Sequence, residues 1–194
     1  MAIFKRADNE VAELVNAILA KHETHQPLLK SKATIDLVFA FAPTDDITGD
    51  PIGHALKLHG VPAHGIARVI SAKDRALGRA DAEITLDGDY WRLAPEPERE
   101  ALLDHELHHF VVVPDGKSFK TDDNGRPVIR TRPHEFEFGW FGIVASRNGA
   151  ASHERMQAKS IMDRAGQLFW PDLFSATSKT EATRFNSLEI NKRK

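Results

Sequence analysis

The short run Asp-His-Glu-Leu-His-His at residues 104–109 constrains the fold more than any other part of the chain. It contains the pattern HExxH as His105, Glu106 and His109. Positions i and i+4 share one face of an α-helix, so the two imidazoles can approach the same point if the run is helical. A helix over residues 98–110 is also expected from the helical spacing of its apolar residues and from its acidic first turn. The fold must therefore bury or present one helix face that carries both histidines.

The spacing within this pattern is typical of a zinc site. Two neutral imidazoles at i and i+4 can bind one Zn²⁺, and a glutamate about 100° further around the helix can reach a water there without ligating the metal. The chain has no cysteine, so histidine and carboxylate must hold any metal, and Fe–S clusters and thiol nucleophiles are excluded. We predict Zn²⁺ as the cofactor, His105 and His109 as ligands, and Glu106 as the general base.

Other histidine pairs near helices have a different spacing. His105 and His108 are at i and i+3 and could also chelate a metal, but we favour the i, i+4 pair because Glu106 is then usable. On this interpretation His108 points away from the metal. Both His108 and Asp104 could still interact with the metal ligands without binding the metal themselves. The run His-Glu-Thr-His at residues 22–25 falls at a helix end, and we interpret it as a solvated C-terminal turn.

A catalytic zinc needs a third protein ligand. The downstream candidates are His134, Glu135, Glu137 and His153. We favour His134, with Glu137 as the alternative, because both share a face of a helix expected over residues 133–147. Glu135 points elsewhere on that helix. His153 follows a capping residue, and we interpret it as a plain surface residue.

The pattern of elements predicts an α+β fold. Runs rich in apolar and β-branched residues near 34–42, 65–70 and 82–87 are expected to form a small mixed or antiparallel sheet packed on the HExxH helix. An edge strand near 82–87 could hold an extended peptide by β-augmentation. Turn signals within residues 111–131 favour small hairpins. Helices are further expected over residues 8–21, 52–59 and 152–169.

The remaining candidate residues have structural interpretations. His54, His59 and His64 are irregularly spaced around Gly and Pro, and we expect them at the surface or at the edge of the core. The charged stretch over residues 73–79 is interpreted as a solvated loop. Five aromatic residues are expected in the core: Trp91, Phe136, Phe138, Trp140 and Phe141.

The charge balance and hydropathy exclude several partners. The chain of 194 residues has 26 Lys+Arg and 28 Asp+Glu, which leaves no global electrostatic case for a nucleic-acid coat or a membrane-surface binder. The longest apolar run, at residues 37–42, is far shorter than the ~20 residues of a membrane span. The first ten residues lack the apolar region of a signal peptide. We therefore expect a soluble cytoplasmic protein without a membrane partner.

Taken together, these residues resemble the phage metallopeptidase domain family, whose members occur in phages and in bacterial genomes that carry prophages. The resemblance covers roughly residues 30–150. The family plan is similar to that of SprT-like zincins, in which HExxH is followed by a third histidine at the start of a later helix, ahead of a Phe. His134 with Phe138 fits that placement. The resemblance is carried by Lys73-Asp74-Arg75, Ala80-Asp81-Ala82, Trp91, residues 101–109, His134-Glu135 and Glu137-Phe138.

The resemblance implies a zinc metallopeptidase that hydrolyses protein or peptide substrates in a bacterial or phage-infected cell. SprT-like proteins suggest substrates bound to DNA, but this chain has no clear DNA-binding motif and no surplus of basic residues. The residues also fit a zinc amidase, a non-catalytic zinc-binding interaction or regulatory module of phage or prophage origin, or a metal-free adaptor. No sequence feature indicates an oligomeric state.

The resemblance and the element pattern together predict a domain organisation. A length near 200 residues fits one domain with extensions. We expect an N-terminal helix within residues 1–28 and a metallopeptidase-like catalytic domain over residues 30–150. A C-terminal helix over residues 151–174 and a flexible polar tail over residues 175–194 follow.

Overall fold

The computed structural model describes residues 2–134, 140–161 and 163. The chain divides into two units, Met1–His153 and Glu154–Lys194. In the second unit, residues 154–161 and 163 are helical, and the helix expected after Ser152 begins at residue 153. The rest of that helix and the expected tail over residues 175–194 lie outside the described residues.

The first unit contains all the named helices and strands. In chain order these are β1 (Ile3–Arg6), α1 (Asn9–Lys21), the 3₁₀ turn η1 (Glu23–His25), α2 (Gln26–Lys30), β2 (Ile35–Phe41), β3 (Lys57–Leu58), β4 (Val61–Pro62), β5 (Gly65–Val69), α3 (Ala72–Ala76), β6 (Ala82–Asp87), α4 (Gly88–Leu93), α5 (Glu96–His108), β7 (Phe110–Val112), β8 (Pro114–Asp115), β9 (Ser118–Phe119), β10 (Ile129–Thr131), α6 (Gly142–Asn148) and the 3₁₀ turn η2 (Gly149–Ala151).

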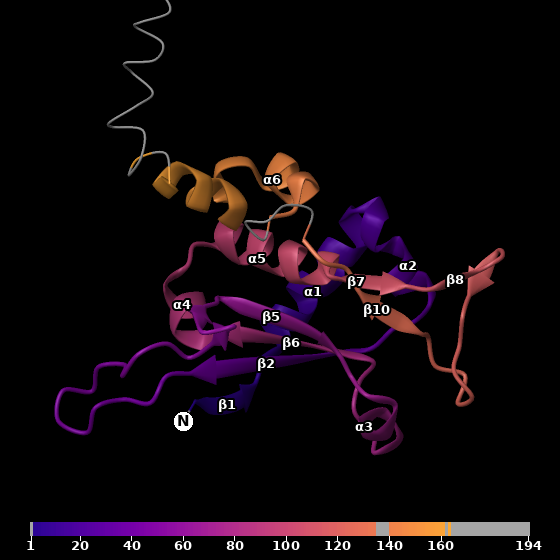
Figure 1. Cartoon of the computed structure of the whole chain (residues 1–194), viewed down its shortest axis with the longest axis horizontal. Coiled ribbons are helices and arrows are strands. Elements are labelled where there is room, and N and C mark those ends of the chain that lie inside the picture. The colour runs from indigo at the N-terminus through magenta and orange to yellow at the C-terminus, as the bar shows by residue number, and fades with distance from the viewer. Residues whose placement is uncertain (1, 135–139, 162, 164–194) are drawn as a thin grey trace, which may run out of the picture. The chain divides into compact units, whose positions relative to one another are not determined.

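A mixed sheet of four strands in the order β1-β2-β6-β5 forms one layer of this unit (Figure 1). β2 and β6 are parallel, and β1 and β5 pair antiparallel to their neighbours. The three predicted strands are confirmed as β2, β5 and β6, and β1 is an additional strand. The prediction that residues 82–87 form an edge is wrong, because β6 has a strand on each side. The two edges are β1 and β5.

Helices α1 and α5 pack on each other and on the sheet. The side chain of Asp8 caps α1 by accepting a hydrogen bond from the backbone N–H of Val11. α5 is buried continuously from Ala101 to His108, because α1, the sheet and α6 each contact it. The HExxH residues therefore lie inside the unit. Among the described residues, no helix is long and apolar enough to cross a membrane.

Two predicted helices differ from the structure. Residues 57–62 form the hairpin β3–β4 instead of a helix over 52–59. Its turn residues His59 and Gly60 both have positive φ, as a type I′ turn requires. Of the helix expected over residues 133–147, the described residues that are helical are those of α6, which begins at Gly142. Residues 132–134 are not helical, because the N–H of Arg132 donates to the carbonyl of His109 at 2.6 Å and continues the β7–β10 pairing.

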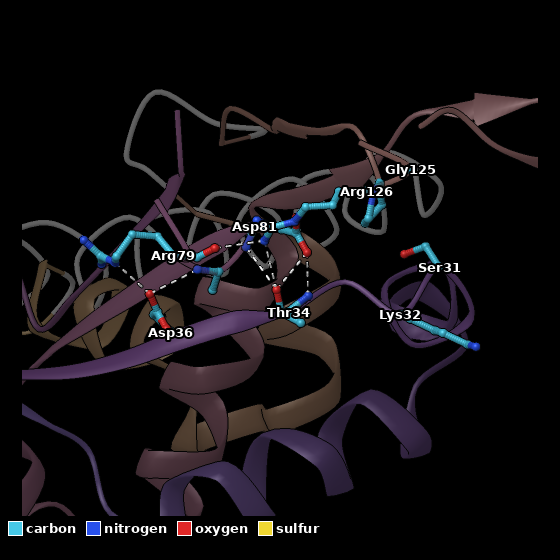
Figure 2. A pocket seen from close by; sticks show the side chains of 11 residues that line it. Ser31, Lys32, Thr34, Asp36, Arg79, Asp81, Gly125 and Arg126 are labelled. Atoms are coloured by element: carbon cyan, nitrogen blue, oxygen red, sulfur yellow. Dashed lines mark hydrogen bonds and ion pairs between the residues drawn. The ribbon is translucent and has the colours of Figure 1, made fainter. Parts of the chain in front are cut away.

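The start of β6 is attached to its surroundings by a buried carboxylate. Oδ2 of Asp81 accepts hydrogen bonds from N and Oγ1 of Thr34, both at 2.8 Å, as Figure 2 shows. Oδ1 forms ion pairs with Nε of Arg126 at 2.9 Å and with Nε of Arg75 at 3.3 Å. The solvated loop expected over residues 73–79 is therefore wrong at Arg75, whose side chain is 8% exposed. A cavity of about 580 Å³ lies beside this network, and its two carboxylates, Asp36 and Asp81, already pair with Arg79 and Arg126.

Candidate metal centre

The structure brings three predicted site residues together. His105, His109 and His134 each offer a ligand nitrogen, and these nitrogens lie within 4.8 Å of one another. His105 is in the last turn of α5, and His109 follows with helical φ and ψ, so their ring centroids are 5.2 Å apart. His134 comes just after β10, which pairs with β7 directly beyond α5. Strand pairing thus returns the chain to the two helix histidines, and His134 reaches them from a non-helical segment.

The distances and protonation of this cluster fit a tetrahedral metal ion. Nε2 of His134 is 3.2 Å from Nε2 of His105. Two nitrogens bound to one tetrahedral Zn²⁺ at about 2.0–2.1 Å lie about 3.3 Å apart. Nδ1 of His109 is 2.8 Å from the carbonyl oxygen of Arg132, and because a carbonyl only accepts, Nδ1 carries the proton. Nε2 of His109 then keeps the lone pair that a metal needs.

The side chain of Glu106 lies against the edge strand β5. Glu106 is 3% exposed. A Cβ built on Gly65 would lie 2.5 Å from Oε1 and 2.8 Å from Cδ of Glu106, which is closer than real Cβ atoms approach. Only glycine at position 65 leaves room for this carboxylate. Gly65 could not be predicted as part of the site, because a glycine at the start of a strand carries no local sign of a partner on a distant helix.

A single aromatic ring contacts every histidine at this end of α5. Phe141 is fully buried, and its ring centroid lies 5.0 Å from that of His105, 4.8 Å from that of His109 and 4.9 Å from that of His134. It also lies 4.7 Å from the ring of His108. The core location predicted for Phe141 is confirmed. The ring additionally forms an apolar wall along one side of the histidine cluster.

A buried carboxylate directly precedes His105. Oδ1 of Asp104 is 2.7 Å from Nε2 of His25 and 3.2 Å from Nη1 of Arg147. Oδ2 accepts a hydrogen bond from Nδ2 of Asn148 at 3.0 Å. Burial favours a raised pKa for Asp104, but the hydrogen bond and charge of His25, together with Asn148 and Arg147, hold the pKa of this carboxyl below its usual value.

One histidine prediction is wrong, and one alternative pairing of histidines is not the one found. The solvated turn expected at residues 22–25 is wrong at His25, which is 1% exposed because Asp104 binds it in the interior. His108 lies outside the group of three ligand nitrogens, so the alternative His105–His108 pair is not the one that converges. Its Nε2 instead accepts from Nη1 of Arg132 at 2.6 Å, close beside the cluster.

Burial keeps two of these imidazoles neutral. It lowers the pKa of His108 to about 4, and the charges of Arg132 and His25 act in the same direction. Burial also lowers the pKa of His109 to about 4, although the hydrogen bond to the Arg132 carbonyl partly opposes this. Neutral imidazole is the form that binds a metal, so His109 is ready to ligate near pH 7.

Of the other third-ligand candidates, only His153 lies in the described part of the chain. Glu135 and Glu137 fall outside the described residues, as do Phe136 and Phe138. His153 is half-buried rather than a plain surface residue, because its ring lies 5.0 Å from that of His64. His64 itself stacks on Tyr90 with ring centroids 3.9 Å apart. Neither His64 nor His153 belongs to the cluster of ligand nitrogens found in the described part of the chain.

The mixed sheet packed on an HExxH helix, with a histidine cluster at the helix end, defines a small zincin-like α+β domain. The sequence model of the family described as "Putative phage metallopeptidase" matches residues 3–165 of the chain, and the protein belongs to this family. The match is wider than the predicted region of resemblance and includes α1. Comparisons with curated proteins and with solved structures give no match. A metallopeptidase family implies a metal ion and peptide substrates, and the three histidines could bind such an ion.

Proposed function

We propose that this protein is a zinc-dependent metallopeptidase in which His105, His109 and His134 bind Zn²⁺ and Glu106 is the general base. The observation that carries the proposal is the convergence of the three imidazole nitrogens within 4.8 Å, at the end of the helix that also bears Glu106. The hydrogen bond from His109 to the Arg132 carbonyl supports the proposal, because a hydrogen bond from the non-ligating ring nitrogen orients a histidine ligand. Family membership supports a peptide as the substrate.

Each residue of the site has a separate role in the proposed reaction. His105, His109 and His134 would hold Zn²⁺, which would supply Lewis-acid activation of a water molecule and of the peptide carbonyl. The Glu106 carboxylate takes a proton from the water as the water oxygen attacks the carbonyl carbon of the peptide. It then gives this proton to the amine nitrogen as the C–N bond breaks, so one water and one peptide bond yield a carboxylic acid and an amine, which become a carboxylate and an ammonium group by proton transfer. Phe141 excludes water from one side of the site.

The edge strand β5 is the expected place for an extended substrate. Among the described residues, β5 pairs with one strand, β6. A peptide that added to the free side of β5 by β-augmentation would run past Gly65 and hence past the Glu106 carboxylate. We therefore expect the substrate at β5. β6, which consists of residues 82–87, lies inside the sheet between two other strands.

Zinc content and peptide hydrolysis of the purified chain test this proposal together. We expect one zinc per wild-type chain, its loss in His105→Ala, and its retention in His54→Ala, an exposed histidine that serves as the control. Glu106→Gln is expected to keep zinc and to lose about 10²–10⁴-fold in hydrolysis of an unfolded protein substrate. A wild type that binds no zinc after reconstitution would contradict the metal site. Zinc without hydrolysis would favour the non-catalytic zinc module.

A further inference from the structure

Asp104 connects three segments of the chain around the histidine cluster. It belongs to α5, it binds His25 at the end of η1, and it binds Arg147 and Asn148 in the last turn of α6. Arg147 also donates from Nη2 to Oγ1 of Thr24 at 2.5 Å, so η1 and α6 are linked to each other as well. These contacts join residues that are 43, 44 and 79 positions from Asp104 in the sequence.

The helix held by these contacts begins directly after Phe141. α6 has seven residues, and so short a helix is not stable through its own hydrogen bonds. Its position therefore depends on tertiary contacts, among which the bonds of Arg147 and Asn148 to Asp104 lie in the interior. Because α6 is only about 10 Å long, fixing its last turn also fixes the ring at its start.

We propose that Asp104 is a positioning residue of the metal centre, which holds α6 against α5 through Arg147 and Asn148 and thereby keeps Phe141 packed on the imidazoles. The inference rests on the proposed function, because it concerns the same site. Its consequence is preorganisation: rings that are already held in a ligating arrangement lose less freedom when the metal binds.

A second buried carboxylate offers a matched control. Asp81 is 1% exposed and pairs with Arg75 and Arg126, as Asp104 pairs with Arg147. Asp81 directly precedes the first residue of β6. Leu86, which pairs with Gly65 beside Glu106, is five residues further along the chain from Asp81. At about 3.3 Å per residue along a strand, Asp81 is roughly 16 Å from Leu86. Asp→Asn at either position removes a buried charge at nearly constant size, but only Asp104 adjoins the histidines.

Zinc affinity of the full chain, measured by competition with a chromophoric chelator, tests the proposal. The absorption spectrum of the Co²⁺-loaded protein gives a second readout that reports ligand geometry. We expect Asp104→Asn to weaken Zn²⁺ binding by about tenfold or more and to change the Co²⁺ spectrum. Phe141→Leu is expected to act in the same direction. Asp81→Asn is expected to lower Tm while leaving both readouts unchanged.

Each outcome supports or contradicts the positioning role proposed for Asp104. Native affinity and spectrum in Asp104→Asn would overturn the proposal, as would an equal loss in Asp81→Asn, because general destabilisation would then explain the effect. If Asp104→Asn does not fold, Phe141→Leu and Arg147→Gln replace it, and native zinc affinity in both overturns the proposal. A wild type without zinc overturns this inference and the proposed function together. Zinc binding without hydrolysis contradicts the peptidase alone.

Discussion

The carboxylate of Glu106 lies so close to the backbone of Gly65 that a Cβ at position 65 would be 2.5 Å from Oε1. Glu106 belongs to α5, and Gly65 is the first residue of the edge strand β5. The group that we expect to move the proton is thus adjacent to the strand that we expect to bind the peptide. This contact makes the site sensitive to a change of one methyl group.

Gly65→Ala is expected to lower kcat/KM for peptide hydrolysis by about 100-fold and to leave the zinc content unchanged. The added methyl group must displace the Glu106 carboxylate, and a misplacement of about 1 Å costs this much in a catalytic site. Steady-state kinetics and metal analysis of the same preparation measure both effects. Arg68→Lys, on the same strand with an exposed side chain, is the control. Wild-type kcat/KM in Gly65→Ala would contradict the role given to this contact.

His134→Ala is expected to lose zinc, and His153→Ala is expected to keep it. Only His134 places a nitrogen within 4.8 Å of those of His105 and His109 in the described part of the chain. Metal analysis after dialysis against a weak chelator distinguishes the two variants. If His134→Ala retained one zinc per chain, the third ligand would be another residue, and Glu137 is the alternative that the sequence favours.

The metal-free protein is expected to lose stability as the pH falls from 6.5 to about 4. Burial lowers the pKa of His108 and of His109 from 6.5 to about 4 in the folded chain. Within this range the unfolded chain binds a proton on each imidazole and the folded chain does not, so the free energy of unfolding decreases with the pH. Above pH 6.5 both states are neutral, and this contribution is constant.

Urea denaturation of chelator-treated protein across this pH range measures the effect. His108→Gln removes one titrating group and keeps a polar side chain opposite Arg132. We expect its pH dependence to be shallower than that of the wild type by up to one proton. A dependence as steep as the wild type's would show that His108 does not carry the effect.

Asp81→Ala is expected to lower the free energy of unfolding by about 3 kcal/mol, because it removes the buried carboxylate that Nε of Arg75 and Nε of Arg126 share. Asp46→Ala, at an exposed position, is expected to change it by less than about 0.5 kcal/mol. The urea midpoints of the two variants at pH 7 provide the comparison. Equal midpoints would mean that the Asp81 network contributes little to stability.

Local sequence patterns predicted the elements whose residues are close in the chain. The apolar spacing of α1 and the Asp8 cap are readable within one helix, and both are present in the structure. The spacing of His105 and His109 brings their rings together on any helix, so this half of the cluster followed from periodicity alone. The β8–β9 hairpin at Gly116 and the turn at Gly125, which an isolated bridge between Thr121 and Pro127 closes, likewise followed from turn signals.

The tertiary structure alone decided how the other side chains reach and surround the two helix histidines. His134 reaches it from a non-helical segment because β10 pairs with β7, a fact that its own neighbours in the sequence do not reveal. His25 looked like a solvated helix end, yet it binds Asp104 from 79 residues away. The physical reason is that burial and pairing of a polar side chain depend on the segments that fold against it. Helical or strand periodicity, by contrast, is a property of the segment itself.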